Sequence, residues 1–354
     1  MKIEVKPFFE IGDGRAASLY VLENDSGVRA EITDFGGAII RLYAPDRTGA
    51  LADVMMGCPN PEDYMKNVAK YLYQGVLLGR NSNRIENAEC DIDGIRYSLE
   101  ANFRQHNIHG GTNGLSFRLM NAETAVTEKG PCLKLTHQMK HLSDDFPGNL
   151  DITVKYTVCA DNTLLIDYDA VSDAATIINL TNHAYFNLAG HASGSIRNQE
   201  LQLEAPFYMP ADELALCTGE ICRVDGTPFD FRKGKSFDDA LSAEHPQTKI
   251  VGGIDHDFLV PGKGYRFVGK ASHPSSGRAM ECYTTLPCVH VFTYLIPESS
   301  PLPGKDGAIY KKYQGFCLET QTVPNAPNMP WFRQPIYKAG EHYKESTGFR
   351  FIVE

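Results

Sequence analysis

The stretch LDITVKYTV (150–158) decides the fold class, because apolar and polar side chains alternate along all nine residues. Every second residue from Leu150 to Val158 is apolar, and the residues between them are Asp, Thr or Lys. A period of two predicts a β-strand with one face buried and the other in water. Asp161-Asn162 then marks a turn, and LLIDYDAV (164–171) is expected to return as the second strand of a hairpin.

Further strand-like runs extend this pattern along the chain. Asp93-Gly94, between CDI and IRYSL, is a tight-turn signature of another hairpin. Helical periodicity is confined to two short segments, 61–72 and 237–244. We therefore expect an all-β protein, a large antiparallel β-sandwich with a few short helices, and one domain over residues 1–354, since no linker or repeat divides the chain. The other β-rich runs lie at 28–32, 38–43, 176–180, 200–204, 289–295, 315–323 and 348–353.

Composition and charge exclude several classes of function. The chain has 354 residues, of which 42% are hydrophobic and 22% charged, as in ordinary globular proteins. Lys and Arg number 34 against 44 Asp and Glu, so the net charge is −10. A protein that binds the phosphate backbone of nucleic acids needs a basic face, so we expect no nucleic-acid partner.

Neither a membrane anchor nor a secretion signal is expected. No stretch approaches 18 uncharged apolar residues, and the start of the chain, MKIEVKPFFEIGDGRAA, lacks the apolar core of a signal peptide. The nine cysteines are scattered from Cys58 to Cys317 without a Cys-x-x-Cys pair, which is typical of reduced thiols. We expect a cytoplasmic protein without a membrane partner, either a monomer or a homodimer.

Four short stretches concentrate hydrogen-bonding side chains where a core strand or a plain turn does not need them: LGRNSNRI (78–85), NIHGG (107–111), NLTNHAYFNL (179–188) and LETQ (318–321). Singly, each has an ordinary structural explanation, such as a surface ion pair for Arg84, a turn for His109 or a hydrogen-bonded core histidine for His183. Glu319 differs, because it follows the apolar run GFCL and a buried Glu is rare unless it is paired.

Together the stretches resemble the aldose 1-epimerase (galactose mutarotase) family. GRNSNRI, NIHGG, TNHAYFNLAG, GGIDHDF and FCLETQTVPNAPN occur in the order that the family shows, and the resemblance runs from about residue 20 to the C-terminus. It implies a galactose mutarotase-like supersandwich that binds a sugar in a cleft on one concave face. It also implies an enzyme that interconverts the α and β anomers of free aldohexoses of the glucose and galactose type.

The resemblance assigns a role to individual residues. Glu319 matches the general base of the family and His183 its general acid. The residues expected to contact or line the sugar are Asn83, Arg84, His109, Tyr185 and Asp255.

The chemistry of ring opening agrees with these residue types. One proton must leave the C1 hydroxyl and another must reach the ring oxygen, and a carboxylate and an imidazole on opposite sides of the sugar can carry both. Each positioned acid or base contributes on the order of 10²–10⁴ in rate. Because only protons move, we expect no cofactor and no metal ion, and a monosaccharide as the only small-molecule partner.

One segment departs from the family pattern. YTTLPCVHVFTYL (283–295) has Leu286, Cys288 and His290 where the family carries Gln, Gly and Gln, and the second of those glutamines normally touches the sugar. We therefore expect His290 to bind the sugar here. The family's Trp after HGG is also absent, since the one Trp of the chain is Trp331. These changes bear on the preferred aldose rather than on the reaction.

Two alternatives stay open at this point. A hexose-6-phosphate 1-epimerase would need a basic phosphate pocket, for which Arg80 and Arg84 are the candidates. A non-catalytic carbohydrate-binding module of the same fold would keep the cleft without turnover. A glycoside hydrolase would need a pair of catalytic carboxylates, which the sequence does not display.

Overall fold

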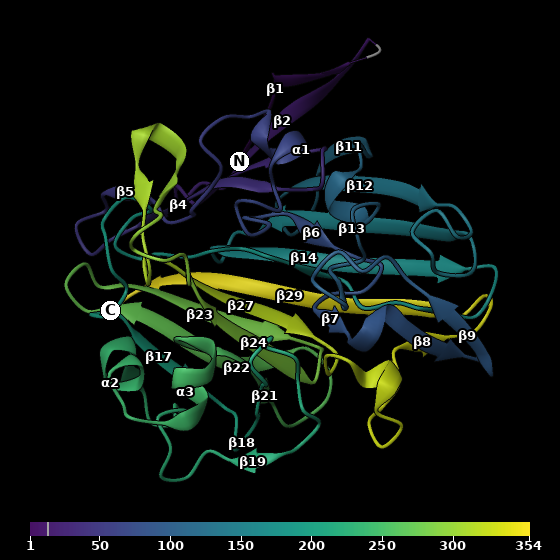
Figure 1. The fold of residues 1–354 in the computed structure, drawn as a ribbon. Coiled ribbons are helices and arrows are strands. Elements are labelled where there is room, and N and C mark those ends of the chain that lie inside the picture. Colours follow the sequence, from purple (N-terminus) through teal and green to yellow (C-terminus); the bar gives the residue numbers. More distant parts are fainter. Residues whose placement is uncertain (13) are drawn as a thin grey trace.

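A computed structural model describes residues 1–12 and 14–354 (Figure 1). Its largest element is a nine-stranded sheet in the order β11-β12-β13-β14-β29-β23-β22-β17-β20, with β29 in the middle. The predicted hairpin is confirmed, because Leu150 pairs with Ser172 and Val158 with Leu164 in antiparallel register. The strands are β11 (Asn121–Val126), β12 (Pro131–Met139), β13 (Leu150–Val158), β14 (Thr163–Ser172), β17 (Glu200–Leu203), β20 (Lys235–Ser236), β22 (Arg266–His273), β23 (Arg278–Thr284) and β29 (His342–Val353).

Two five-stranded sheets accompany it. One, formed by the first five strands in chain order, contains β1 (Lys2–Gly12), β2 (Arg15–Glu23), β3 (Arg29–Thr33), β4 (Ile39–Pro45) and β5 (Leu51–Asp53). The other has the order β19-β18-β21-β24-β27 and contains β18 (Phe207–Met209), β19 (Cys222–Arg223), β21 (Asp255–Leu259), β24 (Cys288–Thr293) and β27 (Phe316–Gln321).

Short two-stranded ladders tie the loops together. They are β6 (Leu77–Leu78) with β16 (Thr181–Asn182), β7 (Arg84–Ile85) with β10 (Asn107–Ile108), β8 (Glu89–Ile92) with β9 (Ile95–Ser98), β15 (Thr176–Ile177) with β28 (Ile336–Tyr337), and β25 (Leu302–Pro303) with β26 (Ile309–Tyr310). The hairpin predicted at Asp93-Gly94 is confirmed by β8 and β9.

Helices are few and short in the part of the chain that the structure describes: α1 (Asp63–Lys66), α2 (Phe237–Leu241) and α3 (Pro246–Val251). The predicted helix at 61–72 is wrong beyond Lys66, because the backbone leaves helical geometry at Asn67 and reaches positive φ at Leu72 and Tyr73. The strand predicted at 176–180 is wrong beyond Ile177. None of the described helices has the length and apolarity needed to span a bilayer. The all-β, antiparallel prediction is confirmed.

One hydrophobic core joins the nine-stranded sheet to the sheet that contains β24 and β27. Ile152 and Val154 of β13 belong to the same buried cluster as Val289 and Val291 of β24 and Leu318 of β27. Because side chains alternate along a strand, the residues between them face the other way. That second face of β21, β24 and β27 carries the candidate site.

Candidate active site

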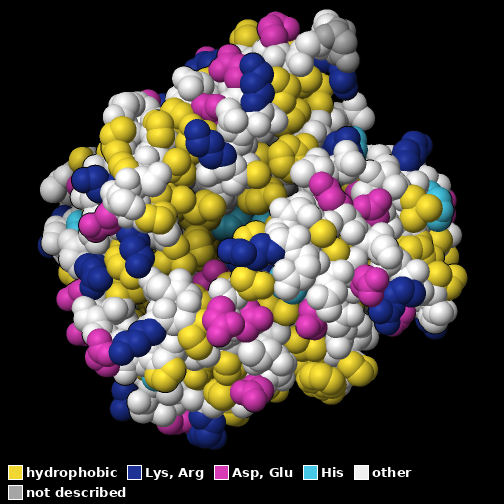
Figure 2. Space-filling view, viewed as in Figure 1, with side chains coloured by type: hydrophobic (Ala, Val, Ile, Leu, Met, Phe, Trp, Pro, Cys, Tyr) yellow, Lys and Arg dark blue, Asp and Glu magenta, His cyan; other side chains and the backbone are white. Residues whose placement is uncertain are grey.

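A cavity of about 240 Å³ lies on this second face, roofed by the loops that carry residues 69–84 and 102–109. Figure 2 shows it as a hollow with histidine side chains on its floor and a basic side chain at its edge. All eight residues singled out from the sequence line it: Asn83, Arg84, His109, His183, Tyr185, Asp255, His290 and Glu319. Segments far apart in the chain thus contribute to one pocket.

The floor of the cavity follows from strand register. In the β21-β24-β27 ladder, Asp257 pairs with His290 and His290 pairs with Glu319, so these three residues form one row across three strands. Asp255, two residues before Asp257, falls on the same face of β21. Sheet geometry therefore places a carboxylate, an imidazole and a second carboxylate side by side.

His183 reaches over this floor from the loop that follows β16. Two backbone hydrogen bonds hold His183 in place. Its amide donates to the Val76 carbonyl, and its carbonyl accepts from the Gly75 amide, 2.8 Å away. The His183 ring is stacked on Tyr185, with the ring centroids 4.8 Å apart and the planes 5° from parallel. The Tyr185 hydroxyl donates to the Leu72 carbonyl, which fixes the stack.

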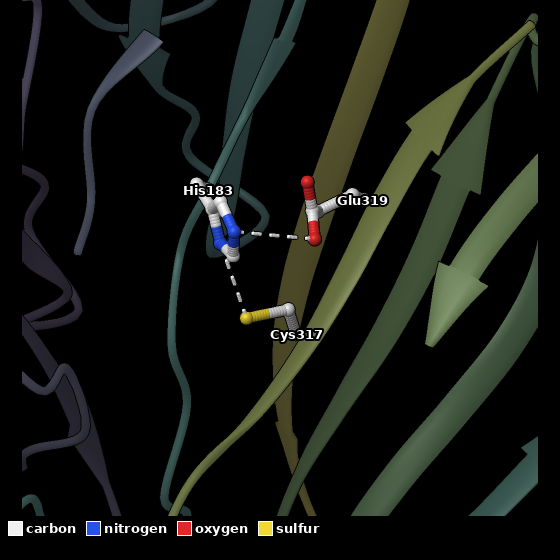
Figure 3. Close-up of side chains that lie close together, drawn as sticks. All are labelled: His183, Cys317 and Glu319. Carbon is white, nitrogen blue, oxygen red and sulfur yellow. Dashed lines mark hydrogen bonds and ion pairs between the residues drawn. The ribbon is translucent and has the colours of Figure 1, made fainter. Parts of the chain in front are cut away.

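Glu319 and His183 face each other across a short gap, as Figure 3 shows. His183 Nε2 lies 3.7 Å from Glu319 Oε1, and the two side chains are 8% and 2% exposed. Glu319 Oε2 is buried and has no hydrogen-bond partner among the described residues, so it is free to accept a hydrogen bond from a ligand. On its other side the imidazole meets a thiol, with Cys317 Sγ 3.4 Å from Nδ1.

Burial opposes a charge on either member of this pair. It raises the pKa of the Glu319 carboxyl to about 7 and lowers the pKa of the His183 imidazole to about 3. Nearby charges modify the effect at Glu319, where His290 lowers the pKa and Asp255 raises it. A carboxyl whose pKa lies near neutrality is suited to general acid–base work.

His109 and Asn83 come from the β10 and β7 segments and hold one another. The His109 amide donates to the Asn83 carbonyl, and the Asn83 amide donates to His109 Nδ1. Because Nδ1 accepts, the ring proton of neutral His109 is at Nε2, where it is available to a ligand. Both residues have a left-handed backbone, with φ of 56° and 60°, a conformation that non-glycine residues adopt mostly in turns and at functional sites.

Arg84 forms one wall of the cavity. Its guanidinium lies 3.7 Å from Asp255 and 5.1 Å from the centre of the Phe103 ring, so an acidic and an aromatic partner orient it. Burial acts to raise the pKa of Asp255, but Arg84 and His290 outweigh it and lower that pKa to about 2. Asp255 is therefore an anion at neutral pH and can accept hydrogen bonds from hydroxyl groups.

His290 is the most enclosed histidine of the floor. Its Nδ1 lies 2.8 Å from Asp257 and its Nε2 3.0 Å from Asp255. Burial acts against its charge, but the two aspartates together raise its pKa well above the ordinary value. The sequence analysis missed Asp257, although the spacing Asp-His-Asp in GGIDHDF puts both aspartates on one strand face.

The site also contains a group of side chains that could hold a metal ion. Ligand atoms of His183, Cys317 and Glu319 all lie within 4.8 Å of one another. The thiol, however, contacts Nδ1 and the carboxylate contacts Nε2, and one ion binds only one ring nitrogen. Burial also raises the pKa of Cys317 well above its usual range, whereas a metal-bound cysteine is a thiolate. The arrangement favours proton transfer over metal binding.

Arg80, proposed from the sequence as part of a phosphate pocket, lies outside the cavity. It is fully buried, with two nitrogens 2.8 and 2.9 Å from Asp144 and a third bonded to Thr176 and to two backbone carbonyls. Its guanidinium fastens the loop at 144–148 to the sheet. The expectation that Arg80 binds a phosphate is wrong, because its guanidinium is buried and already paired with the Asp144 carboxylate.

Comparisons with known proteins agree with this geometry. The sequence matches the model of the family described as Aldose 1-epimerase over residues 18–350. It is 37% identical to the galactose mutarotase of Homo sapiens, over 96% of this chain and 95% of that protein, and 32% identical to the aldose 1-epimerase of Escherichia coli, over 97% of each.

Solved structures agree as well. A GalM/aldose epimerase homologue from C. elegans superposes with a TM-score of 0.86 at 28% identity, covering 96% of this chain and 99% of that one. A galactose 1-epimerase from Lactobacillus acidophilus superposes with a TM-score of 0.85 at 24% identity, over 99% of each chain, which supports the fold. The chain belongs to the aldose 1-epimerase family.

Proposed function

We propose that this protein is an aldose 1-epimerase that interconverts the α and β anomers of free aldohexoses of the glucose and galactose type. The observation that carries the proposal is the meeting of Glu319 and His183, 3.7 Å apart, in one buried cavity. These residues are 136 positions apart in the chain, so only the fold brings them together.

In the proposed reaction Glu319 removes the proton of the C1 hydroxyl while His183 gives a proton to the ring oxygen. The bond between C1 and the ring oxygen breaks, and the free aldehyde forms. Rotation about C1–C2 presents the other face of the carbonyl. As the ring closes, Glu319 gives its proton to the carbonyl oxygen, and His183 takes its proton back from the hydroxyl that becomes the ring oxygen again. No atom other than hydrogen is exchanged with the protein.

The reaction requires Glu319 to start as a carboxylate and His183 to start protonated. This ion pair carries the same number of protons as the neutral pair, so the two arrangements interconvert without uptake of a proton from water. Burial disfavours each charge alone, but opposite charges that form together offset one another. A sugar seated between them completes the path of the proton.

The remaining polar side chains are suited to hold the pyranose. Arg84 and His109 offer N–H donors, and Asp255 offers a carboxylate acceptor for vicinal hydroxyls. Phe103 and Phe292 give the cavity an apolar side against which the C–H face of a sugar ring can pack. We propose Asn83, Tyr185 and His290 as further lining residues of the sugar site.

A hexose 6-phosphate is a poorer fit. Asp255, Asp257 and Glu319 are three carboxyl groups on the floor, and a dianionic phosphate would meet unfavourable charge there. Arg84 is already paired with Asp255, and Arg80 lies elsewhere. A binding module without turnover is also disfavoured, because both proton-transfer groups are present and in reach of one another.

We further propose that the chain acts as one domain in the cytoplasm, as a monomer or a homodimer. The family match over residues 18–350 supports a single unit. All nine cysteines are described and are free thiols, which supports a reducing compartment.

Polarimetry tests the proposal directly. Protein is added to freshly dissolved α-glucose, α-galactose and α-glucose 6-phosphate, and the approach of the optical rotation to equilibrium is followed. We expect acceleration with at least one free aldohexose and a much smaller effect with the phosphate. No acceleration with any aldose, or full activity in Glu319→Gln, would refute the proposal.

A further inference from the structure

His290 stands between two carboxylates, with one ring nitrogen close to each. Nδ1 is 2.8 Å from Asp257 Oδ1, the nearer of its two polar neighbours, and Nε2 is 3.0 Å from Asp255 Oδ1. Asn83 Nδ2, the other neighbour of Nδ1, is 3.4 Å away. A histidine flanked by anions on both nitrogens is most stable with both nitrogens protonated, since a neutral ring would leave two buried carboxylates facing each other.

The neighbour of His290 on the other side is the candidate base. His290 of β24 is the register partner of Glu319 of β27, and Asp257 of β21 is the register partner of His290. Directly opposite residues of an antiparallel ladder have Cβ atoms about 4.5–5.5 Å apart and share a face. A charge on His290 therefore acts on Glu319 at short range, and both residues are buried.

We propose that His290 is a fixed cation, held in place by Asp257 and Asp255, whose field favours the anionic form of the candidate base Glu319 and thereby sets the pH range of the reaction. The inference rests on the proposed function and gives His290 a role beyond contact with the sugar. It makes Asp257 a positioning residue, which acts on the base through His290.

Among the described residues, the charged and titratable groups around His290 are compatible with this role. Asp255 and Asp257 come from β21, Glu319 from β27 and Arg84 from β7. His109 lines the same cavity, and burial lowers its pKa, so it adds no competing positive charge at neutral pH. Burial also lowers the pKa of His183, which carries a positive charge only in the ion pair with Glu319 from which the reaction starts. With His290 and Arg84 charged, the two cations balance the two aspartates, and Glu319 can ionise without facing a net negative floor.

The chain offers a matched control in His256. This histidine lies on β21 between Asp255 and Asp257, so its side chain points to the opposite face of the strand. Its Nε2 is 2.9 Å from Gln247 Oε1, and burial lowers its pKa to about 3, so it is neutral where His290 is charged. His256→Gln removes an imidazole from the same ladder without removing a charge.

The first test needs no variant. The ¹⁵N shifts of the His290 ring in the wild-type protein report whether one or both nitrogens carry a proton. We expect the doubly protonated signature at pH 7 and still at pH 8, whereas free histidine is mostly neutral there. A neutral tautomer of His290 at pH 7 overturns the inference.

The second test measures the base itself. The Glu319 carboxyl is titrated by ¹³C NMR in the wild type, His290→Gln, His290→Lys and His256→Gln, all without sugar. Removal of the charge is expected to raise the Glu319 midpoint by about one to two pH units. His290→Lys should keep the midpoint near that of the wild type, and so should His256→Gln. An unchanged midpoint in His290→Gln, or an equal rise in the His256 control, overturns the inference.

The third test links the charge to turnover. The pH profile of kcat/KM for anomer exchange, corrected for the uncatalysed rate at each pH, should move to higher pH in His290→Gln by the same interval as the Glu319 midpoint. A lower plateau with an unmoved profile would mean that His290 only contacts the sugar, and would overturn the inference. If no aldose is turned over at all, the proposed function fails, while both NMR tests still decide the charge of His290 and its effect on Glu319.

Discussion

Replacement of Glu319 by Gln is expected to stabilise the protein at alkaline pH while it removes the candidate base. The residue as a whole is 1% exposed, and its Oε2 has no hydrogen-bond partner among the described residues. A buried carboxylate with an unsatisfied oxygen costs free energy, and an amide of the same shape carries no charge to bury.

The magnitude follows from the pKa of Glu319. Burial raises it from 4.5 to about 7, so the folded state binds the proton more tightly than the unfolded chain. A group of this kind stabilises the fold fully below the unfolded pKa, and that contribution is lost as pH rises through the folded value. The wild type should therefore lose about 3 kcal/mol relative to Glu319→Gln between pH 4 and pH 8.

Urea unfolding at several pH values measures the difference, since the free energy of unfolding falls linearly with denaturant. We expect Glu319→Gln and the wild type to be similar at pH 4 and the variant to be the more stable at pH 8, with anomer exchange reduced by on the order of 10²–10⁴. Glu123→Gln, at a side chain that is 74% exposed, is the control and should show neither effect. A variant that is less stable than the wild type at pH 8 would refute the reasoning.

Two further predictions concern single contacts. The Cys317 thiol can donate a hydrogen bond to His183 Nδ1 or accept one from it. Cys317→Ala should therefore lower kcat about fivefold with little change in KM, whereas Cys317→Ser should keep most of the wild-type kcat. Exchange NMR measures both variants. Comparable loss in both variants would mean that packing, not the hydrogen bond, matters. Arg80→Met should destabilise the fold by roughly 3–5 kcal/mol in urea unfolding, because it strands the buried Asp144 carboxylate. Arg96→Ala, which breaks exposed ion pairs, should change stability little, and an equal effect of the two would contradict this ranking.

Much of the fold could be predicted from the sequence, because strand alternation is a local signal. LDITVKYTV and its return strand pair as the expected hairpin, and Cys317, Glu319 and Gln321 lie on one face of β27 as period two requires. The helix at 61–72 was overestimated because Val68 and Tyr71 are buried in a satellite cluster by tertiary packing, without helical geometry. Helix α3 was missed, although Pro246 at its start and Gly252 in left-handed geometry at its end are helix boundary signals.

The site could be predicted only in part. Residue types and family motifs singled out eight residues that line the cavity. No local pattern shows that His183 approaches Glu319, since that contact depends on how loops cross the sheet. Asp257 and the row that it forms with His290 and Glu319 needed the strand order β21-β24-β27. The pairing of Arg80 with Asp144 could not be predicted either, because the two residues are 64 positions apart in the chain.

The most direct measurement is anomer exchange at C1, followed by NMR at equilibrium for the wild type, Glu319→Gln, His183→Asn and the double variant on the preferred aldohexose. If the two residues pass protons through one bound sugar, each single variant should lose on the order of 10²–10⁴ in rate, and the double variant should be little worse than the more impaired single one. Exchange at the wild-type rate in either single variant, or losses that multiply in the double variant, would contradict the account.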